Sequence, residues 1–180
     1  MPPEKLPGGP TQDEIMAISV QKLGLRMTDT VLEIGCGTGK VSVAISRKVK
    51  SVIAIDARPE AVMFAEKTAK KAGAQNIRFS HIEATAYLGH AGNFDCAFIG
   101  GTQNLLSILP SLKKRVKRNI VINAVLLSTV SDAISAMQEL GIFTEAIQVQ
   151  VSRSHDLAGS VMFKPINPVW IIVGRGKACL

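Results

Sequence analysis

The chain is poor in aromatic residues, with six Phe, one Trp and one Tyr among its 180 residues. Proteins that hold single-stranded nucleic acid usually stack its bases on aromatic side chains, so this scarcity argues against that role. Long apolar runs are also missing, and no segment approaches the roughly 20 apolar residues that a membrane helix needs. Residues 1–10 form a leader rich in Pro and Gly without an apolar signal core, so we expect a cytoplasmic protein without a membrane partner.

Cysteine is scarce as well. Cys36, Cys96 and Cys179 are odd in number and widely spaced. This spacing predicts neither a disulfide framework nor a zinc site, and we expect no metal centre. We expect Cys36 and Cys96 to be small buried apolar side chains.

Positive charge, by contrast, is abundant. The net charge is +7 and the pI is about 9.5. A basic protein attracts polyanions, which include nucleic acids and small polycarboxylates. The densest basic run, residues 113–118, lies between an apolar helix and an apolar strand, where cations typically complement a helix end. The length and the 47% hydrophobic content predict one domain over residues 1–180.

The most informative stretch is residues 31–39, an apolar strand followed by a loop with glycine at every second position. A dinucleotide-binding fingerprint would need a small residue at Lys40, and a phosphate-binding P-loop would need glycine at Ile34 and a hydroxyl at Val41. Both are excluded. Glu33 precedes the loop, and a carboxylate suits a cationic or amine-bearing ligand rather than a phosphate. The combination resembles the S-adenosylmethionine site of Rossmann-like methyltransferases.

A second acidic residue follows the next strand. Residues 52–55 are a continuous apolar run, which predicts a buried parallel strand, and the run ends in Asp56. A right-handed crossover would bring Asp56 beside the glycine loop. Its carboxylate could then accept hydrogen bonds from both hydroxyls of a ribose. The alternative is a helix-capping role just before Pro59.

The remaining patterns alternate between strand and helix, which is typical of an α/β fold. Strands are expected at residues 31–34, 52–55, 77–80, 94–99, 119–125, 144–151 and 169–173. Helices are expected at residues 40–48, 59–72, 105–115 and 129–140. Residues 152–168 are expected to form a loop, and loops of this kind often carry substrate contacts.

Four segments together resemble one family, the decarboxylating precorrin methyltransferases of cobalamin biosynthesis. They are residues 9–14, residues 33–39, the pair Gly100-Gly101, and Asn167-Pro168-Val169. The family comprises the cobalt-precorrin-6B carbon-15 methyltransferases and precorrin-8w decarboxylase, and it is similar to the C-terminal half of the precorrin-6Y enzyme. The resemblance implies a Rossmann-like class I methyltransferase fold. Its doubly wound sheet would have seven mostly parallel strands, with the last strand antiparallel.

The resemblance also implies the contacts to S-adenosylmethionine. Residues 82–84 would cover the adenine, where the family usually has Gly-Asp-Ala and this chain has Ile-Glu-Ala. A backbone contact from Ala84 is therefore more secure than a side-chain contact from Glu83. The implied cofactor-binding residues are Thr11, Glu33, Gly35, Cys36, Gly37, Thr38, Gly39, Asp56, Glu83 and Ala84.

The implied reaction methylates carbon-15 of a corrin precursor and removes carbon dioxide from the acetate arm on carbon-12. The conjugated macrocycle can supply the electron-rich carbon, so no catalytic side chain is predicted and the enzyme mainly aligns the reactants. The substrate carries several carboxylates, and Arg153, His155 and Lys164 are the candidates to bind them. Their alternative is a role as solvated loop charges. The resemblance further implies a homotetramer.

Two other functions stay open at the level of sequence. An RNA or DNA methyltransferase would share the cofactor site and also be basic. Enzymes that methylate base amino groups commonly have Asn/Asp-Pro-Pro-aromatic after the fourth strand, whereas residues 98–102 read Phe-Ile-Gly-Gly-Thr. This difference argues against amino-group methylation but not against carbon or ribose methylation. The second alternative is a non-catalytic cofactor-binding subunit.

Overall fold

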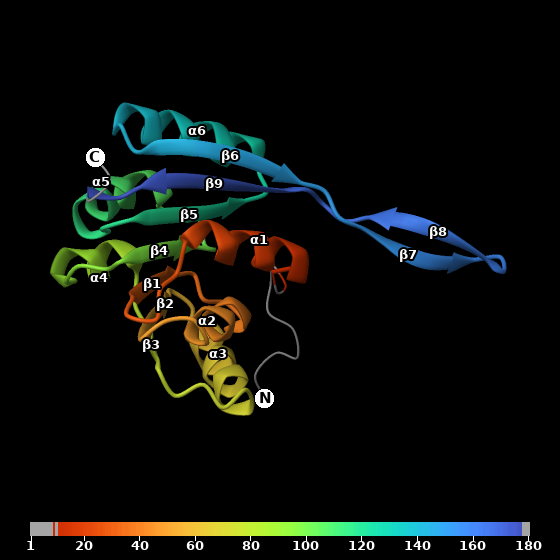
Figure 1. Ribbon diagram of the computed structural model, residues 1–180, viewed down its shortest axis with the longest axis horizontal. Coiled ribbons are helices and arrows are strands. Elements are labelled where there is room, and N and C mark those ends of the chain that lie inside the picture. The colour runs from red at the N-terminus through yellow and green to blue at the C-terminus, as the bar shows by residue number, and fades with distance from the viewer. Residues whose placement is uncertain (1–8, 10, 178–180) are drawn as a thin grey trace.

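A seven-stranded sheet in the order β3-β2-β1-β4-β5-β9-β6 runs through the computed structural model, which describes Gly9 and residues 11–177 (Figure 1). Strands β1 to β5 pair in parallel, and β9 lies between β5 and β6, antiparallel to both. This confirms the predicted mostly parallel sheet with an antiparallel last strand. The strands are β1 (Thr30–Ile34), β2 (Ser51–Asp56), β3 (Ile77–His81), β4 (Cys96–Ile99), β5 (Asn119–Ala124), β6 (Phe143–Val149) and β9 (Val169–Arg175).

Helices cover both faces of this sheet and create two separate cores (Figure 1). Leu32 of β1 belongs to the core under α4, α5 and α6, and its neighbour Val31 belongs to the core under α1 and α2. Because strands buried on both faces need apolar residues at successive positions, they read as continuous apolar runs in the sequence. The helices are α1 (Asp13–Leu23), α2 (Lys40–Ser46), α3 (Pro59–Lys71), α4 (Ala84–His90), α5 (Leu105–Arg115) and α6 (Leu127–Glu139).

Local signals set the helix ends. Pro59 opens α3, where its fixed φ suits the first turn, and Gly24 ends α1 with a left-handed φ of 59°. The predicted elements are all present, with ends shifted by at most two residues, but sequence patterns singled out neither α1 nor α4. Within the part of the chain that the structure describes, no helix has the length and apolarity needed to cross a membrane.

The prediction of a loop at residues 152–168 is wrong for most of that segment. Strands β7 (Ser152–Leu157) and β8 (Ser160–Pro165) form an antiparallel hairpin that projects from the body of the molecule (Figure 1). Ala158 and Gly159 join them, with φ of 50° and 78°. Positive φ at both central residues is the pattern of a type I′ turn, which usually reads Asn-Gly or Asp-Gly in sequence. Alanine at the first position concealed this turn.

Candidate functional site

A cavity of about 410 Å³ opens at the carboxyl edge of the parallel strands, between the segments that follow β1, β2, β3 and β4. Because these four strands are neighbours and parallel, their ends meet at one place, which is where open α/β sheets bind ligands. The predicted cofactor-binding residues that line the cavity are Thr11, Glu33, Gly35, Cys36, Gly37, Thr38, Asp56, Glu83 and Ala84.

The three glycines of the loop have different surroundings, although all have positive φ. A Cβ on Gly35 would lie 2.4 Å from the amide nitrogen of Gly101, so Gly35 allows the loop after β1 to pack on the turn after β4. A Cβ on Gly39 would lie 2.7 Å from the Cα of Ala65, and Gly39 is outside the cavity lining. A Cβ on Gly37 would meet nothing within 4 Å. Gly37 therefore leaves the space that a ligand can occupy.

Asp56 ends β2 and is 5% exposed. Its Oδ2 accepts hydrogen bonds from the Gly37 amide at 3.0 Å and from Arg58 Nη2 at 3.1 Å, and its Oδ1 accepts from Arg58 Nε and the Arg58 amide, each at 3.0 Å. Burial acts to raise the pKa of Asp56, but the bonds from Arg58 and Gly37 outweigh it and hold the pKa below its ordinary value. Asp56 is thus an ionised acceptor. It is not the cap of α3, because the N-cap residue is Arg58.

Glu33 lines the same cavity, but its surroundings favour the protonated form, whereas those of Asp56 favour the ionised form. Glu33 is 1% exposed, and its Oε2 accepts a hydrogen bond from the hydroxyl of Ser42 in α2. Burial raises its pKa from 4.5 to about 8, the nearby charge of Asp56 adds to this, and the bond from Ser42 opposes it. A cation in the cavity would favour the ionised form of Glu33, since an opposite charge lowers the pKa of a carboxyl group.

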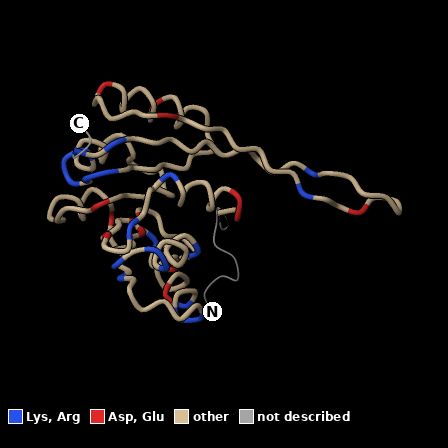
Figure 2. The backbone as a smooth tube through the Cα atoms, in the orientation of Figure 1, with Lys and Arg blue, Asp and Glu red and all other residues tan. Residues whose placement is uncertain are grey.

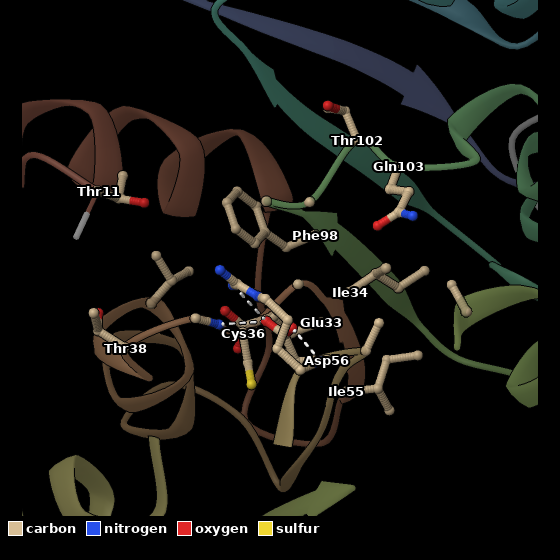
Figure 3. A pocket seen from close by; sticks show the side chains of 18 of the residues that line it. Thr11, Glu33, Ile34, Cys36, Thr38, Ile55, Asp56, Phe98, Thr102 and Gln103 are labelled. Atoms are coloured by element: carbon tan, nitrogen blue, oxygen red, sulfur yellow. Dashed lines mark hydrogen bonds and ion pairs between the residues drawn. The ribbon is translucent and has the colours of Figure 1, made fainter. Parts of the chain in front are cut away.

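The opposite wall comes from β4 and the turn that follows it, and sequence reasoning gave these residues no role. Figure 3 shows Phe98 on one side of the cavity, in this view, and Asp56 on the other, with Thr102 and Gln103 beside Phe98. Ile82 adds a further apolar surface and donates its amide to the Asp56 carbonyl at 3.0 Å. The available sequence signal was an aromatic residue, Phe98, in a strand that ends directly before two glycines.

Lys40 holds the entrance to the cavity together. Its Nζ lies 2.7 Å from Asp13 Oδ1 and donates a hydrogen bond to the Thr11 carbonyl at 3.3 Å. These two interactions of Lys40, the first residue of α2, connect the start of α1 and the residue Thr11 before it to the end of the glycine loop. Thr11 reaches the cavity through this arrangement, and Gly9 also lines it. The rest of the predicted leader, residues 1–8 and 10, lies outside the described residues.

The three substrate-binding candidates lie on one face of the hairpin. Arg153 is directly opposite Lys164, and His155 is opposite Met162, so alternation along the strands places all three side chains on the same side. Arg153 forms an ion pair with Glu14 at 2.8 Å. None of the three lines the cavity. Arg153 is nevertheless tied to α1 close to Thr11, so the charged face begins near the cavity entrance.

The cysteines have no chemistry of their own in this site. Cys36 and Cys96 are unpaired and buried, as the sequence predicted, and Cys179 lies outside the described residues. Burial raises the pKa of the Cys36 thiol far above its usual range, so it stays neutral. Among the described residues, no group of three or more His, Cys, Asp or Glu side chains could hold a metal ion.

The basic run at residues 113–118 lies at the other edge of the sheet, before β5 begins (Figure 2). Four of its five cations, Lys113, Arg115, Lys117 and Arg118, bond within the protein. Lys113 donates to the Leu140 carbonyl at 2.7 Å, and Lys117 pairs with Asp95 at 2.9 Å. This arrangement matches the predicted helix end better than a ligand-binding patch.

Comparison with known proteins gives consistent matches over almost the whole chain. A family model described as a precorrin methyltransferase domain matches residues 7–174. A protein of Methanosarcina acetivorans named probable cobalt-precorrin-6B C(15)-methyltransferase (decarboxylating) is 47% identical over 176 residues, 95% of this chain and 96% of the relative. The crystal structure of precorrin 8w decarboxylase from Methanobacterium thermoautotrophicum has a TM-score of 0.90 at 28% identity and covers 94% and 95% of the two chains. Precorrin-6y C5,15-methyltransferase from Geobacter metallireducens has a TM-score of 0.88 at 28% identity, covering 95% and 93%.

Proposed function

Because the chain belongs to the precorrin methyltransferase family, we propose that it methylates carbon-15 of a corrin precursor in cobalamin biosynthesis and releases carbon dioxide from the acetate arm on carbon-12. The main support for this proposal is the near full-length match to relatives that are named for this activity. The cavity at the carboxyl edge of the sheet supports an enzymatic role over that of a non-catalytic subunit.

S-adenosylmethionine is the methyl donor that we propose for this cavity, and it supplies an electrophilic methyl group when bound. The donor and acceptor groups fit it. Asp56 offers an ionised acceptor for ribose hydroxyls, and the open space at Gly37 lets a ligand approach the backbone. Glu33 is a carboxyl group that gains its charge when a cation arrives, which suits the amino end of the cofactor. Ile82 and Ala84 supply a surface for the adenine.

The macrocycle would meet the charged face of the hairpin. Arg153 and Lys164 lie directly opposite each other, and like charges in this position are destabilising. Glu14 offsets the charge of Arg153 at the base of the hairpin, and an anionic partner on this face would compensate Lys164 as well. Arginine can clamp a carboxylate through two parallel hydrogen bonds. The substrate's carboxylates provide this partner, and the chain's part in the reaction is to align carbon-15 with the methyl group.

Replacing Arg153 tests this contact. Arg153→Ala is expected to weaken macrocycle binding by about ten- to a hundredfold, since a hydrogen bond to a charged group is worth about 1.5–3 kcal/mol. Cofactor affinity should stay nearly constant. Glu14→Gln is the control, because it breaks the ion pair with Arg153 and leaves the guanidinium in place. An equal loss of macrocycle affinity in both variants would contradict a direct contact with the substrate. It would mean that Arg153 only holds the hairpin in place through Glu14.

The reaction itself is tested with S-adenosylmethionine labelled in the methyl group and a corrin precursor labelled in the acetate arm. We expect transfer of the first label to carbon-15 and release of the second as carbon dioxide. A parallel titration with tRNA at several salt concentrations tests the alternative of a nucleic-acid methyltransferase. In that case the protein would bind tRNA, and its affinity for tRNA would fall steeply with salt. Methylation of tRNA with no turnover of the precursor would overturn the proposal.

We propose in addition that the protein is a cytoplasmic homotetramer that binds neither nucleic acid nor membranes. The hairpin exposes Val161 and Phe163 on the face opposite Arg153, at 63% and 68% exposure, and assembly would cover them. Unpaired Cys36 and Cys96 agree with a reducing compartment. Sedimentation equilibrium tests the homotetramer, which a monomer at micromolar concentration would contradict, and cell fractionation tests the cytoplasmic location.

A further inference from the structure

The carboxylate of Asp56 is fully engaged before any ligand is considered. A carboxylate has about four lone-pair sites for hydrogen bonds. Asp56 accepts from four donors, which are the Gly37 amide, the Arg58 amide, Arg58 Nε and Arg58 Nη2. The two amides belong to the backbone of the glycine loop and of the turn before α3. The other two belong to one guanidinium, which grips both carboxylate oxygens as a fork.

A bound ribose would use the same two carboxylate oxygens of Asp56 as hydrogen-bond acceptors. Its two adjacent hydroxyls would donate to a carboxylate at the end of β2, again as a fork. With the lone-pair sites taken, both forks cannot bind Asp56 together. The backbone donors are set by the fold, so the guanidinium of Arg58 is the group that can leave.

We propose that Arg58 is a latch on the nucleoside end of the cavity, occupying the ribose position on Asp56 and leaving when ribose binds. The proposal rests on the proposed cofactor role of this cavity. Arg58 lowers the affinity for every ligand with a free ribose diol, cofactor and demethylated product alike. It also keeps the buried carboxylate compensated whenever the site holds no nucleoside, since an unpaired buried charge is strongly unfavourable.

The surroundings of Arg58 suit such a movement. Its side chain is 40% exposed, whereas that of Asp56 is 4% exposed, so the cation can move toward solvent while the anion stays. Arg58 is the N-cap residue of α3 and lines the cavity. The hydrogen bond to Asp56 raises the pKa of Arg58, and the charge of Glu60 in the first turn of α3 contributes as well. Glu60 therefore offers a second anion near the released guanidinium.

The test compares adenosine with 2′,3′-dideoxyadenosine, which lacks the ribose diol. Arg58→Met keeps an apolar stem and removes both donors of the fork. It is expected to tighten adenosine binding by about three- to tenfold, the scale of a partly exposed ion pair, and to leave dideoxyadenosine binding unchanged. Arg58→Lys keeps the charge without the fork and should give an intermediate gain. Calorimetry or ligand-observed magnetic resonance measures these affinities without turnover.

Arg47→Met is the matched control, because it removes the same charge from the end of α2, outside the cavity. It should change neither affinity. Thermal unfolding of each variant checks that it is folded. Weaker or unchanged adenosine binding in a folded Arg58→Met variant would overturn the latch, because Arg58 would then support the site. If the unaltered protein bound neither adenosine nor S-adenosylhomocysteine, the cofactor assignment itself would fail, and the latch with it.

Discussion

At the scale of single residues, the cavity holds two carboxyl groups whose surroundings push their pKa values apart. Asp56 is kept ionised by four hydrogen bonds, whereas Glu33 is kept protonated by burial up to a pKa of about 8. Divergent pKa values in one site usually mark different roles. Asp56 is suited to accept hydroxyl donors, and Glu33 is suited to respond to a cation.

Glu33 should therefore make both stability and ligand binding depend on pH. Between its ordinary pKa of 4.5 and its folded value of about 8, the folded protein holds a proton that the unfolded chain releases. Stability of the ligand-free protein falls as the pH rises through this window. Glu33→Gln should remove that fall, as urea unfolding at about pH 5 and pH 8 would detect.

The same residue predicts proton release on cofactor binding. If Glu33 ionises beside the amino group of the cofactor, binding below pH 8 should release protons from the unaltered protein. Calorimetry in buffers of different ionisation enthalpy measures this release, and Glu33→Gln should abolish it. Loss of binding in Glu33→Ala alone, with none in Glu33→Gln, would instead favour a structural role through Ser42.

Gly37 offers a second test at this scale, with Gly73 as its control. Both have positive φ and open space around an added Cβ, so valine imposes a similar backbone strain at either position. Gly37 lines the cavity and Gly73 does not. Gly37→Val should weaken S-adenosylhomocysteine binding at least tenfold, while Gly73→Val should leave it near the original value, as calorimetry would show. Similar affinities in the two variants would remove Gly37 from the ligand contacts.

At the scale of elements, the hairpin of β7 and β8 is the part that the sheet does not support. An isolated two-stranded hairpin is marginal in water, and here every residue of both strands is exposed. The contacts at its base include the ion pair of Arg153 with Glu14 and the hydrogen bond from the Ile166 amide to the Val151 carbonyl at 2.8 Å. Arg153 also donates to Gln12, and Gln150 donates to the Ile166 carbonyl. Such a segment adds little to the core. Its presence is therefore better explained by a contact with a ligand or another subunit than by the stability of the fold.

Removing the hairpin separates its function from that of the cavity. Replacing residues 152–165 with Asn-Gly, which favours a tight turn, closes the chain at the existing bond between Val151 and Ile166. We expect unchanged cofactor affinity, loss of the proposed tetramer and loss of macrocycle binding. Sedimentation and calorimetry provide the measurements. A tetramer that persists without the hairpin would place the subunit interface elsewhere.

At the scale of the whole molecule, the carboxyl ends and the amino ends of the parallel strands have different roles. The carboxyl edge carries the cavity, where segments after four different strands meet. At the opposite edge, Arg118 pairs with the buried Asp29 at 2.5 Å, and Lys117 pairs with Asp95. Arg118 and Lys117 thus hold loops together, and the anion-binding role remains with the hairpin as part of the proposed function.

A ligand that bridges these segments should stabilise the entire domain. S-adenosylhomocysteine at about one hundred times its Kd contributes about 2.7 kcal/mol, which raises the Tm of a chain of this size by about 5–10 °C. Thermal unfolding monitored by circular dichroism measures this shift. Asp56→Ala, which removes the ribose acceptor, should lose most of it at the same ligand concentration. A full shift in that variant would contradict the role of Asp56.

The sequence by itself determined the α/β order, the glycine loop and the two acidic positions. These features depend on local rules, because continuous apolar runs mark strands buried on both faces and glycine marks turns with positive φ. Glu33 and Asp56 could be placed close together because both lie at the carboxyl ends of neighbouring parallel strands. The resemblance to a family added the remaining site residues and the reaction.

Only the tertiary structure decided what surrounds those positions. The packing of Gly35 on Gly101, the grip of Arg58 on Asp56 and the wall formed by Phe98 all join segments whose contact depends on how the sheet is assembled. The hairpin escaped prediction because its turn has Ala158 where asparagine is usual. Burial and pairing, which set the opposite charge states of the two carboxyl groups, are properties of the folded chain and have no local sequence signature.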